Sequence, residues 1–479
     1  MTLVPALRRA SVAVVLFLGA FAAQAGVAFH VTVTTERISK PDLNTGVAAR
    51  ESGDSDVVLG PHFISIRDGT MLSVLDFAAR RRHVIDTAAA VYDSYSLFDG
   101  VGLRAAELRH RQAMAGALKA AGLDPHATPL VYEEQALSLL ASKRRGPLLP
   151  NVHDGAVLWS LDRQPLLKLS IGGSPASDAE ARAFVQWLRY AWGAHPLVLD
   201  LLAGGKRIPA DFTLHYQEAG GTVTRQFHIS RLALDAPATY APATYALGAY
   251  RPRPLSAGAT PLERVLAQAA LLPPPSPQAH PSLRAEAERL FAANQPFEAF
   301  LTMLEDHFST GALVENLSLQ QQMAMQQCQP IHDLTRGLLA KDQEGIAAAL
   351  VTVQELRQQA GLAQPVLALF EGNLRAKLGQ WPAATALYLQ VLQAKPQMAA
   401  VYQDLGDALY AQFDGPHAWR SWDAGRAMAP SLRQFRKVNE LERSLLADYP
   451  AFFTDVLAGQ PSTSRPASRT KTVGSTNLP

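Results

Sequence analysis

The stretch GNLRAKLGQWPAATALYLQVLQAKP, residues 372–396, decides the fold of the carboxyl-terminal half, because part of its skeleton returns at residues 406–430 as GDALYAQFDGPHAWRSWDAGRAMAP. One constant offset joins Gly372 to Gly406, Ala384 to Ala418, Tyr388 to Trp422 and Pro396 to Pro430. A glycine inside a helix costs about 1 kcal/mol relative to alanine. Two glycines at equivalent positions therefore predict helices packed so closely that any side chain would collide there.

This period of 34 residues resembles the tetratricopeptide repeat, a helical hairpin whose copies stack into a superhelix. The resemblance covers about residues 365–430 and implies two hairpins. Glu371 departs from the family's usual leucine, which Leu405 supplies in the second unit. Phe413 stands where the first unit has its turn glycine, Gly379. A generic helical bundle is the alternative interpretation.

Such repeats normally need at least three units for stability, so we expect degenerate units between residues 282 and 360. There, KDQEGIAAALVTVQEL places Ala347 and Val351 at the expected small-then-large spacing. The segment LRQFRKVNELERSLL would form a helix that shields the last apolar face. We expect turns at Asn294, Gly311, Gly345, Gly361 and Gly379.

The tetratricopeptide resemblance also implies a concave groove, lined by the first helix of each hairpin, that holds an extended peptide or a partner helix. The implied lining residues are Leu369, Asn373, Ala376, Lys377, Gln403, Asp407 and Tyr410. This set is mixed in charge and lacks the Lys/Arg cluster of a groove that clamps a carboxylate. We therefore expect a partner other than a free peptide carboxyl terminus, with ordinary solvated residues as the alternative.

The amino-terminal half alternates apolar and polar residues, which predicts β-strands. Between residues 57 and 97, HFISIRDG and MLSVLDFAARRRHVIDTAAAVYDSYSLF predict an antiparallel meander with a turn at Asp68-Gly69. Residues 210–217 and 222–234 alternate in the same way. These strands predict a mostly antiparallel sheet with one covered face, and hence an α+β domain.

Two helices are predicted within this half. Residues 100–123 form the first, which Gly122 closes. Ser177 and Glu180 form an S-x-x-E capping box that begins the second. Its residues at positions i, i+3, i+4 and i+7 are expected to be core residues rather than a cofactor stack; they are Phe184, Trp187, Leu188 and Ala191.

Residues 64–86, ISIRDGTMLSVLDFAARRRHVID, are similar in pattern to exported lipoprotein carriers of the LolA type. The similarity lies in short antiparallel strands soon after a secretory segment, and no diagnostic residue carries it. It implies a curved half-barrel sheet folded over helices, with room for acyl chains. The basic run Arg80, Arg81 and Arg82 is either a solvated hairpin, which we favour, or an anion site.

The first 25 residues, MTLVPALRRASVAVVLFLGAFAAQA, have the order of a cleavable secretory signal. Arg8 and Arg9 precede an uncharged run, and Ala23-Gln24-Ala25 is an A-x-A cleavage site. The run is shorter than the roughly 20 residues of a spanning helix. We therefore favour cleavage over a membrane anchor and expect no membrane span in the mature chain. A periplasmic location follows, with secretion from the cell as the alternative.

Removal of this signal deletes two arginines and no acids, so Lys+Arg falls from 44 to 42 against 42 Asp+Glu. A chain without net charge or a concentrated basic stripe has little attraction for nucleic acid, and we expect no nucleic-acid partner. Cys328 is the single cysteine, so an internal disulfide is impossible. We expect its thiol to be buried.

Composition marks the boundaries between domains. APATYAPATYALGAYRPRPLSAGATP and LLPPPSPQAHPS are rich in proline and are expected to be extended, without a packed core. The predicted division is a signal at 1–25, an α+β domain at 26–235, a Pro/Ala-rich linker at 236–281, a helical repeat domain at 282–450 and a disordered tail at 451–479.

Motifs of catalysis are sparse. The 13 histidines form neither H-x-H nor H-E-x-x-H, and the sequence has no phosphate-binding or dinucleotide fingerprint. The strand-to-helix stretch Gly172-Gly173-Ser174 lacks the G-x-S-x-G pattern of a nucleophile turn. Ser174 and His195 stay open only as an arbitrary pair for a triad assembled across the fold. We therefore predict no catalytic residue and no cofactor.

One group of soft metal ligands lies close together in the sequence. Met323, Met325, Cys328 and His332 offer thioether, thiolate and imidazole groups, which suit Cu(I). Pro330 is expected to begin a new helix, which would break the geometry between the cysteine and the histidine. We favour core packing of these residues and keep copper as the alternative.

The sequence thus favours a non-enzymatic bacterial protein, exported to the periplasm, whose tetratricopeptide-like module binds a protein or peptide partner. Such a module would help assemble or maintain the cell envelope. One alternative is a lipid or lipoprotein carrier whose amino-terminal half-barrel holds the ligand. Another is an enzyme with an unrecognised site in the amino-terminal domain.

Overall fold

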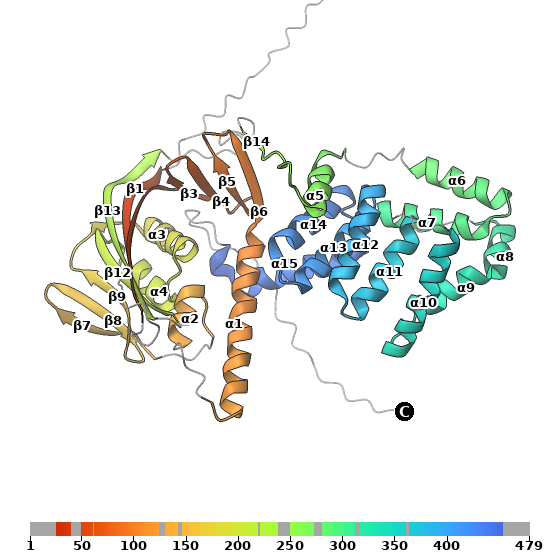
Figure 1. Ribbon diagram of the computed structural model, residues 1–479. Coiled ribbons are helices and arrows are strands. Elements are labelled where there is room, and N and C mark those ends of the chain that lie inside the picture. The colour runs from red at the N-terminus through yellow and green to blue at the C-terminus, as the bar shows by residue number, and fades with distance from the viewer. Residues whose placement is uncertain are drawn as a thin grey trace, which may run out of the picture.

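A computed structural model of the chain describes residues 25–39, 49–60, 62–123, 130–141, 146–218, 221–237, 250–272, 280–311, 317–360 and 364–453. A part built on one large sheet is followed by an all-helical part (Figure 1), which confirms the predicted fold class. Residues 1–24, with most of the predicted signal, and residues 454–479, with most of the predicted tail, lie outside the described residues.

Twelve strands form the large sheet, in the order β14-β6-β5-β4-β3-β2-β1-β13-β12-β9-β8-β7. Neighbouring strands are antiparallel, except that the short β14 runs parallel to β6. The predicted meander is confirmed as β2 to β6, and Gly69 takes the left-handed conformation, with φ +54°, in the turn that follows β3. A separate pair of two-residue strands, β10 and β11, lies apart from this sheet.

The strands are β1 (Ala25–Ser39), β2 (Ala49–Leu59), β3 (Phe63–Asp68), β4 (Met71–Asp76), β5 (Arg81–Asp86), β6 (Val91–Ser96), β7 (Leu149–His153), β8 (Ala156–Leu161), β9 (Gln164–Ser170), β10 (Ser174–Pro175), β11 (Arg207–Ile208), β12 (Asp211–Glu218), β13 (Gly221–Pro237) and β14 (Arg251–Pro252).

Four helices accompany the sheet: α1 (Leu97–Ala120), α2 (Leu130–Leu137), α3 (Asp178–Ala191) and α4 (Pro196–Gly204). The sheet curves around α3 and α4, while α1 stands between the sheet and the helical part (Figure 1). The capping box of Ser177 and Glu180 is confirmed at the start of α3. Phe184, Trp187 and Leu188 are buried as predicted. Ala191 is exposed, because it is the last residue of the helix, so its prediction as core is wrong.

The helical part contains α5 (Pro261–Leu271), α6 (His280–Ala292), α7 (Pro296–Thr310), α8 (Leu319–Gln327), α9 (Gln329–Leu338), α10 (Gln343–Ala360), α11 (Pro365–Lys377), α12 (Trp381–Ala394), α13 (Ala399–Ala411), α14 (Gly415–Met428) and α15 (Arg436–Asp448), with short 3-10 turns η3 (Arg433–Phe435) and η4 (Pro450–Phe452). Helices α11 to α14 pack against their chain neighbours, as two hairpins would (Figure 1).

Close helix contact explains the two spaced glycines. A Cβ atom added to Gly372 in α11 would lie 2.6 Å from Cε1 of Tyr388, and one added to Gly406 in α13 would lie 2.9 Å from Cε2 of Trp422. Both distances are far below a normal van der Waals contact. Gly379 and Phe413 take the same left-handed conformation, with φ of +74° and +64°, after α11 and α13.

Several turn and packing predictions in the helical part need correction. Gly345 lies inside α10 rather than in a turn, and Gly361 lies outside the described residues. Ala347 and Val351 face solvent, because Ile346, Ala349 and Val353 form the buried face of that helix. Asn294, Gly311 and Gly379 have positive φ angles at the ends of helices, as the predicted turns require.

The proline-rich segment is only partly described: residues 251–258 are exposed, whereas the helix that follows them is packed. Helix α5 begins with a capping box between Thr260 and Glu263, and it buries Val265 and Leu266. It packs against α12 and α14 of the helical part. The prediction that the whole of residues 236–281 is extended is therefore wrong, because a helix with an apolar face lies within it.

The two parts contact each other through side chains from both. Phe98 at the start of α1 stacks on Trp419 of α14, with ring centroids 5.7 Å apart. Phe452 of η4 is 2% exposed and packs edge-on against Tyr190 of α3, with centroids 5.5 Å apart. The predicted tail at 451–479 is therefore wrong for residues 451–453, and its other residues lie outside the described ones. Among the described helices, none has the length and apolar character to cross a membrane.

Candidate functional site

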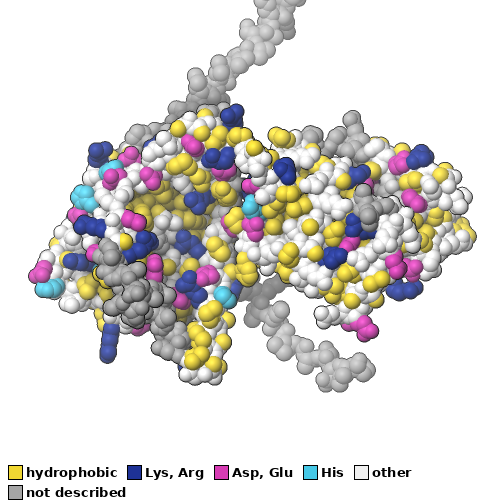
Figure 2. Space-filling model, viewed as in Figure 1, with side chains coloured by type: hydrophobic (Ala, Val, Ile, Leu, Met, Phe, Trp, Pro, Cys, Tyr) yellow, Lys and Arg dark blue, Asp and Glu magenta, His cyan; other side chains and the backbone are white. Residues whose placement is uncertain are grey.

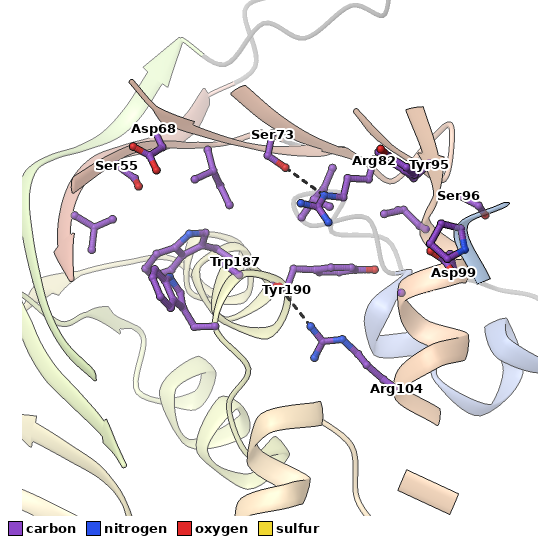
Figure 3. A pocket seen from close by; sticks show the side chains of 18 residues that line it. Ser55, Asp68, Ser73, Arg82, Tyr95, Ser96, Asp99, Arg104, Trp187 and Tyr190 are labelled. Atoms are coloured by element: carbon purple, nitrogen blue, oxygen red, sulfur yellow. Dashed lines mark hydrogen bonds between the residues drawn. The ribbon is translucent and has the colours of Figure 1, made fainter. Parts of the chain in front are cut away.

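A cavity of about 620 Å³ lies between the curved sheet and α3, and the first turns of α1 form a third wall (Figure 3). This volume is within the roughly 300–1,000 Å³ of small-molecule sites. Figure 2 shows the molecule hollowed under the sheet, where hydrophobic side chains gather with Lys or Arg side chains among them. Its apolar lining includes Val31, Ile66, Leu75, Trp187, Tyr190 and Trp192, and its polar lining includes Ser55, Asp68, Ser73, Arg82, Asp99 and Arg104.

The alternation of β5 sends two neighbouring arginines to opposite faces of the sheet. Arg82 lies on the cavity face, opposite Leu75 of β4. Arg81 lies on the other face, where its Nε donates a 3.1 Å hydrogen bond to Oγ of Ser94 and its guanidinium pairs with Asp423 of α14. The favoured prediction of a solvated hairpin is wrong for Arg81, because this side chain is held at the contact between the two parts.

Arg82 is a cation on the cavity wall that has no carboxylate partner among the described residues. Its Nε donates one long hydrogen bond, 3.4 Å, to Oγ of Ser73 on β4. A guanidinium carries five N–H donors in a fixed fork. Most donors of this exposed arginine are therefore open to the cavity.

Arg104 reaches the cavity from α1, on the wall opposite the sheet (Figure 3). Its guanidinium donates to the backbone oxygen of Leu137, at 3.0 Å, and to that of Tyr190, at 3.4 Å. These oxygens belong to the last turns of α2 and α3, where a positive charge is favourable. Burial lowers the pKa of Arg104, but an arginine stays protonated at neutral pH.

Trp187 forms part of the cavity wall from α3. The side chain is 1% exposed, and its ring packs edge-on against Phe29 of β1, with centroids 5.1 Å apart. Its Nε1–H has no hydrogen-bond acceptor among the described residues. A buried N–H without a partner costs about 1–3 kcal/mol. This donor is therefore an unmet hydrogen-bonding group in the wall of the cavity.

The helical part closes the rim of the cavity beside Asp99 of α1. Pro416 of α14 lines the cavity, and a Cβ atom added to Gly415 would lie 2.5 Å from Oδ1 of Asp99. Burial, with a further contribution from Asp414, raises the pKa of Asp99 to about 6. The protonation of this carboxyl group therefore changes near neutral pH, at the place where the two parts meet.

A second cavity of about 380 Å³ lies on the opposite face of the sheet, between β5 and β6 on one side and α5 and α14 on the other. Leu266 and Met428 line it, together with Arg81 and Asp423. These two charged groups are paired with each other, and Arg420 of α14 is the remaining charged residue of the lining.

The predicted groove residues divide into buried and accessible ones. Leu369 and Gln403 are buried, at 0% and 6% exposure, so neither lines a groove open to solvent, and the prediction is wrong for these two. Ala376 is half-buried against the helical core. Lys377 and Tyr410 are exposed, as a groove would require.

Two further groove residues are engaged within the helical part. Asn373 accepts a 2.6 Å hydrogen bond from the hydroxyl of Tyr388, and Asp407 accepts a 3.1 Å bond from Nε1 of Trp422. These bonds hold the two large rings that face the spaced glycines. Both side chains are half-buried, so the structure gives them a role in helix packing and leaves their contact with a partner a prediction.

The Ser174 and His195 pair does not form a catalytic arrangement. His195 is fully buried, its Nδ1 accepts from the backbone N–H of Leu197, and its Nε2 lies 3.2 Å from Oε2 of the buried Glu134. Both ring nitrogens are therefore occupied within the core. No nitrogen is left to activate a serine hydroxyl.

The soft metal ligands surround the junction of two helices. Pro330 lies in the first turn of α9, as predicted, and Cys328 separates α8 from α9. Met323 is 49% exposed, whereas Met325 and Cys328 are half-buried against the helical core. Nε2 of His332 lies 2.5 Å from the backbone oxygen of Gln326, so this nitrogen is occupied and is not directed at a metal.

Of the cavity residues, Arg82 was named only within the less favoured alternative of an anion site at Arg80, Arg81 and Arg82. Arg104 and Trp187 were not predicted as site residues. One feature of the sequence could have indicated Arg82. It is a charged residue on β5 that pairs with Leu75 of β4, on the apolar face of the meander. Trp187 has no such signal, since its spacing is that of any core residue. No protein-family model matches this chain, and no curated protein matches it either.

Proposed function

We propose that this protein is an exported, non-enzymatic carrier that holds a small amphipathic molecule in the cavity under its sheet. The single observation that carries the proposal is the cavity of about 620 Å³, which is lined by aromatic and aliphatic side chains and by a few polar groups. Ligand sites are of this kind, because apolar walls supply affinity and a few placed polar groups fix orientation. The proposed export rests on the order of residues 1–25.

Two other observations support a carrier over an enzyme. The curved antiparallel sheet over helices is the arrangement that the resemblance to LolA-type carriers implies. The helical part also closes the rim of the cavity through Pro416, so a bound molecule would be shielded from solvent by both parts of the chain.

The test is a blocking substitution on the cavity face of β2. Ser55 lines the cavity and pairs with Val31 of β1, so Ser55→Trp would fill the space between sheet and helix. Ser52 lies three residues earlier on the same strand and hence on the opposite face. It is exposed, so Ser52→Trp is the matched control.

Binding of N-phenyl-1-naphthylamine, a neutral apolar fluorophore, would be titrated into the full-length protein and both variants. We expect saturable binding to the unchanged protein and to Ser52→Trp, and at least about tenfold weaker binding to Ser55→Trp, or about 1.4 kcal/mol. Mass spectrometry of the purified protein under native conditions should also detect a retained amphiphile. Equal binding by all three proteins would place the probe elsewhere and contradict the proposal.

We propose a second function for the helical part, the docking of a protein or peptide partner on the first helices of its spaced hairpins. The observation that favours it is the exposure of Lys377 on α11 and Tyr410 on α13, at neighbouring places along the stack. Full-length protein and the double variant Lys377→Ala, Tyr410→Ala would be compared as baits in envelope extracts. Recovery of the same proteins by both baits would contradict docking at this surface.

A further inference from the structure

We propose, on the basis of the carrier function above, that the cavity selects amphiphiles with a negatively charged headgroup and that Arg82 binds this headgroup. The chemical class is an acyl or alkyl chain that ends in a carboxylate or a phosphate. The apolar wall would take the chain, and the headgroup would lie between the sheet and α1.

The first support is the lack of a charged partner for Arg82. Its side chain reaches into the cavity from β5 (Figure 3), and among the described residues its hydrogen bond is the long one to Ser73. Arg81, its neighbour in sequence, has the carboxylate of Asp423 as a partner, whereas Arg82 has none among the described residues. A charged, forked donor on a partly apolar wall is the usual means of binding a planar or tetrahedral anion.

The second support is the set of other donors around the cavity. Arg104 brings a second positive charge from the opposite wall, and the ring of Tyr190 lies between the two guanidinium groups (Figure 3). Two guanidinium groups on facing walls make this end of the cavity positively charged, which favours an acidic headgroup there.

The acidic side chains of the lining define where the headgroup lies. Asp68 belongs to the end of β3, beside Ser55 and away from Arg82 in Figure 3. Asp99 lies at the rim, near α14. We therefore place the anion at the Arg82 end of the cavity and the apolar chain along Ile66, Leu75 and Trp187.

The experiment compares ligands that share one alkyl chain and differ in headgroup. Dodecanoate, dodecyl phosphate, 1-monolauroylglycerol and dodecyltrimethylammonium would be titrated into the full-length protein by calorimetry, below their critical micelle concentrations. We expect both anions to bind at least about tenfold more tightly than the neutral ligand, and the cation to bind most weakly. The tighter anion of the two identifies the headgroup.

Variants at two exposed arginines, on the two strands that flank β4, assign the site. Arg82→Gln should remove the preference for anions and keep the affinity for 1-monolauroylglycerol within about twofold of that of the unchanged protein. Arg82→Lys should retain part of the preference for anions. Arg67 of β3 is exposed, does not line the cavity and lies on the other face of the sheet, so Arg67→Gln should change nothing. Retention of the unfolding temperature by Arg82→Gln would show that the fold is intact.

The two proposals fail in different ways. Equal affinity for anionic and neutral ligands, or an unchanged preference in Arg82→Gln, would overturn the headgroup assignment and leave the carrier function standing. A preference for the cationic ligand would also overturn it. Failure of every ligand to bind, or binding that Ser55→Trp does not weaken, would overturn both.

Discussion

The contact between Gly406 and the indole of Trp422 allows a sharp test of the helix packing. A Cβ atom at Gly406 would lie 2.9 Å from Cε2 of that ring, and nearer still to Nε1 and Cδ1. The ring has little freedom to move away, since it packs against Trp419 at 5.1 Å and bonds to Asp407. Overpacking costs about 1–3 kcal/mol, whereas replacing glycine by alanine in a helix gains about 1 kcal/mol. We therefore expect Gly406→Ala to lower the free energy of unfolding by about 1 kcal/mol, and by at most about 2 kcal/mol.

Urea unfolding of the full-length protein, followed by far-ultraviolet circular dichroism, would measure this loss. Gly116 is the matched control, because it lies in the exposed outer half of α1 and nothing lies within 4 Å of an added Cβ atom. Gly116→Ala should stabilise the protein by up to about 1 kcal/mol. Trp422→Phe, combined with Gly406→Ala, should recover part of the loss. A Gly406→Ala protein as stable as the Gly116→Ala protein would refute the close-contact explanation.

Two further predictions concern stability. Burial, and then the neighbouring Asp407, raise the pKa of Asp404 to about 7, so the folded state binds more protons than the unfolded state between about pH 4 and 7, and stability falls as pH rises through that window. Asp404→Asn should therefore raise the free energy of unfolding, measured with urea, more at pH 8 than at pH 5, by roughly 1–2 kcal/mol after allowance for partial exposure. Equal changes at both pH values would contradict this. Phe452→Ala should lower the free energy of unfolding by about 3 kcal/mol and weaken fluorophore binding, because the Phe452 ring packs against Tyr190 of the cavity wall. Phe413 is 92% exposed, so Phe413→Ala should change neither quantity. Unchanged fluorophore binding by Phe452→Ala would show that this contact does not support the cavity.

Short-range sequence patterns correctly predicted several strands of the sheet and the start of one helix. Period-two alternation predicted the meander, and the S-x-x-E spacing from Ser177 predicted the start of α3. The same spacing from Thr260 to Glu263 marks the start of α5, but the surrounding prolines led us to predict an extended linker. Proline at the first positions of a helix is compatible with helix formation, so the capping signal outweighed composition.

The candidate site needed information that no local pattern contains. The cavity forms because β1 to β6, α1 and α3 meet in space, and nothing in the spacing of Arg82, Arg104 or Trp187 shows that they line one cavity. The groove was predicted from the repeat resemblance alone, which assigned Leu369 and Gln403 to an open surface. The tight helix contact at the two glycines instead buries that part of both helices.

Tyr190 both lines the cavity and holds the last described turn, η4, in place. The ring of Tyr190 lines the cavity, and its hydroxyl donates a hydrogen bond to the backbone oxygen of Phe452. The two equilibria are therefore linked. If a ligand in the cavity changes the equilibrium constant for docking of residues 450–452 by some factor, docking of those residues changes the affinity for the ligand by the same factor. Under the proposed carrier function, we therefore expect loading of the cavity to change the rate at which a protease cleaves the peptide bonds after α15.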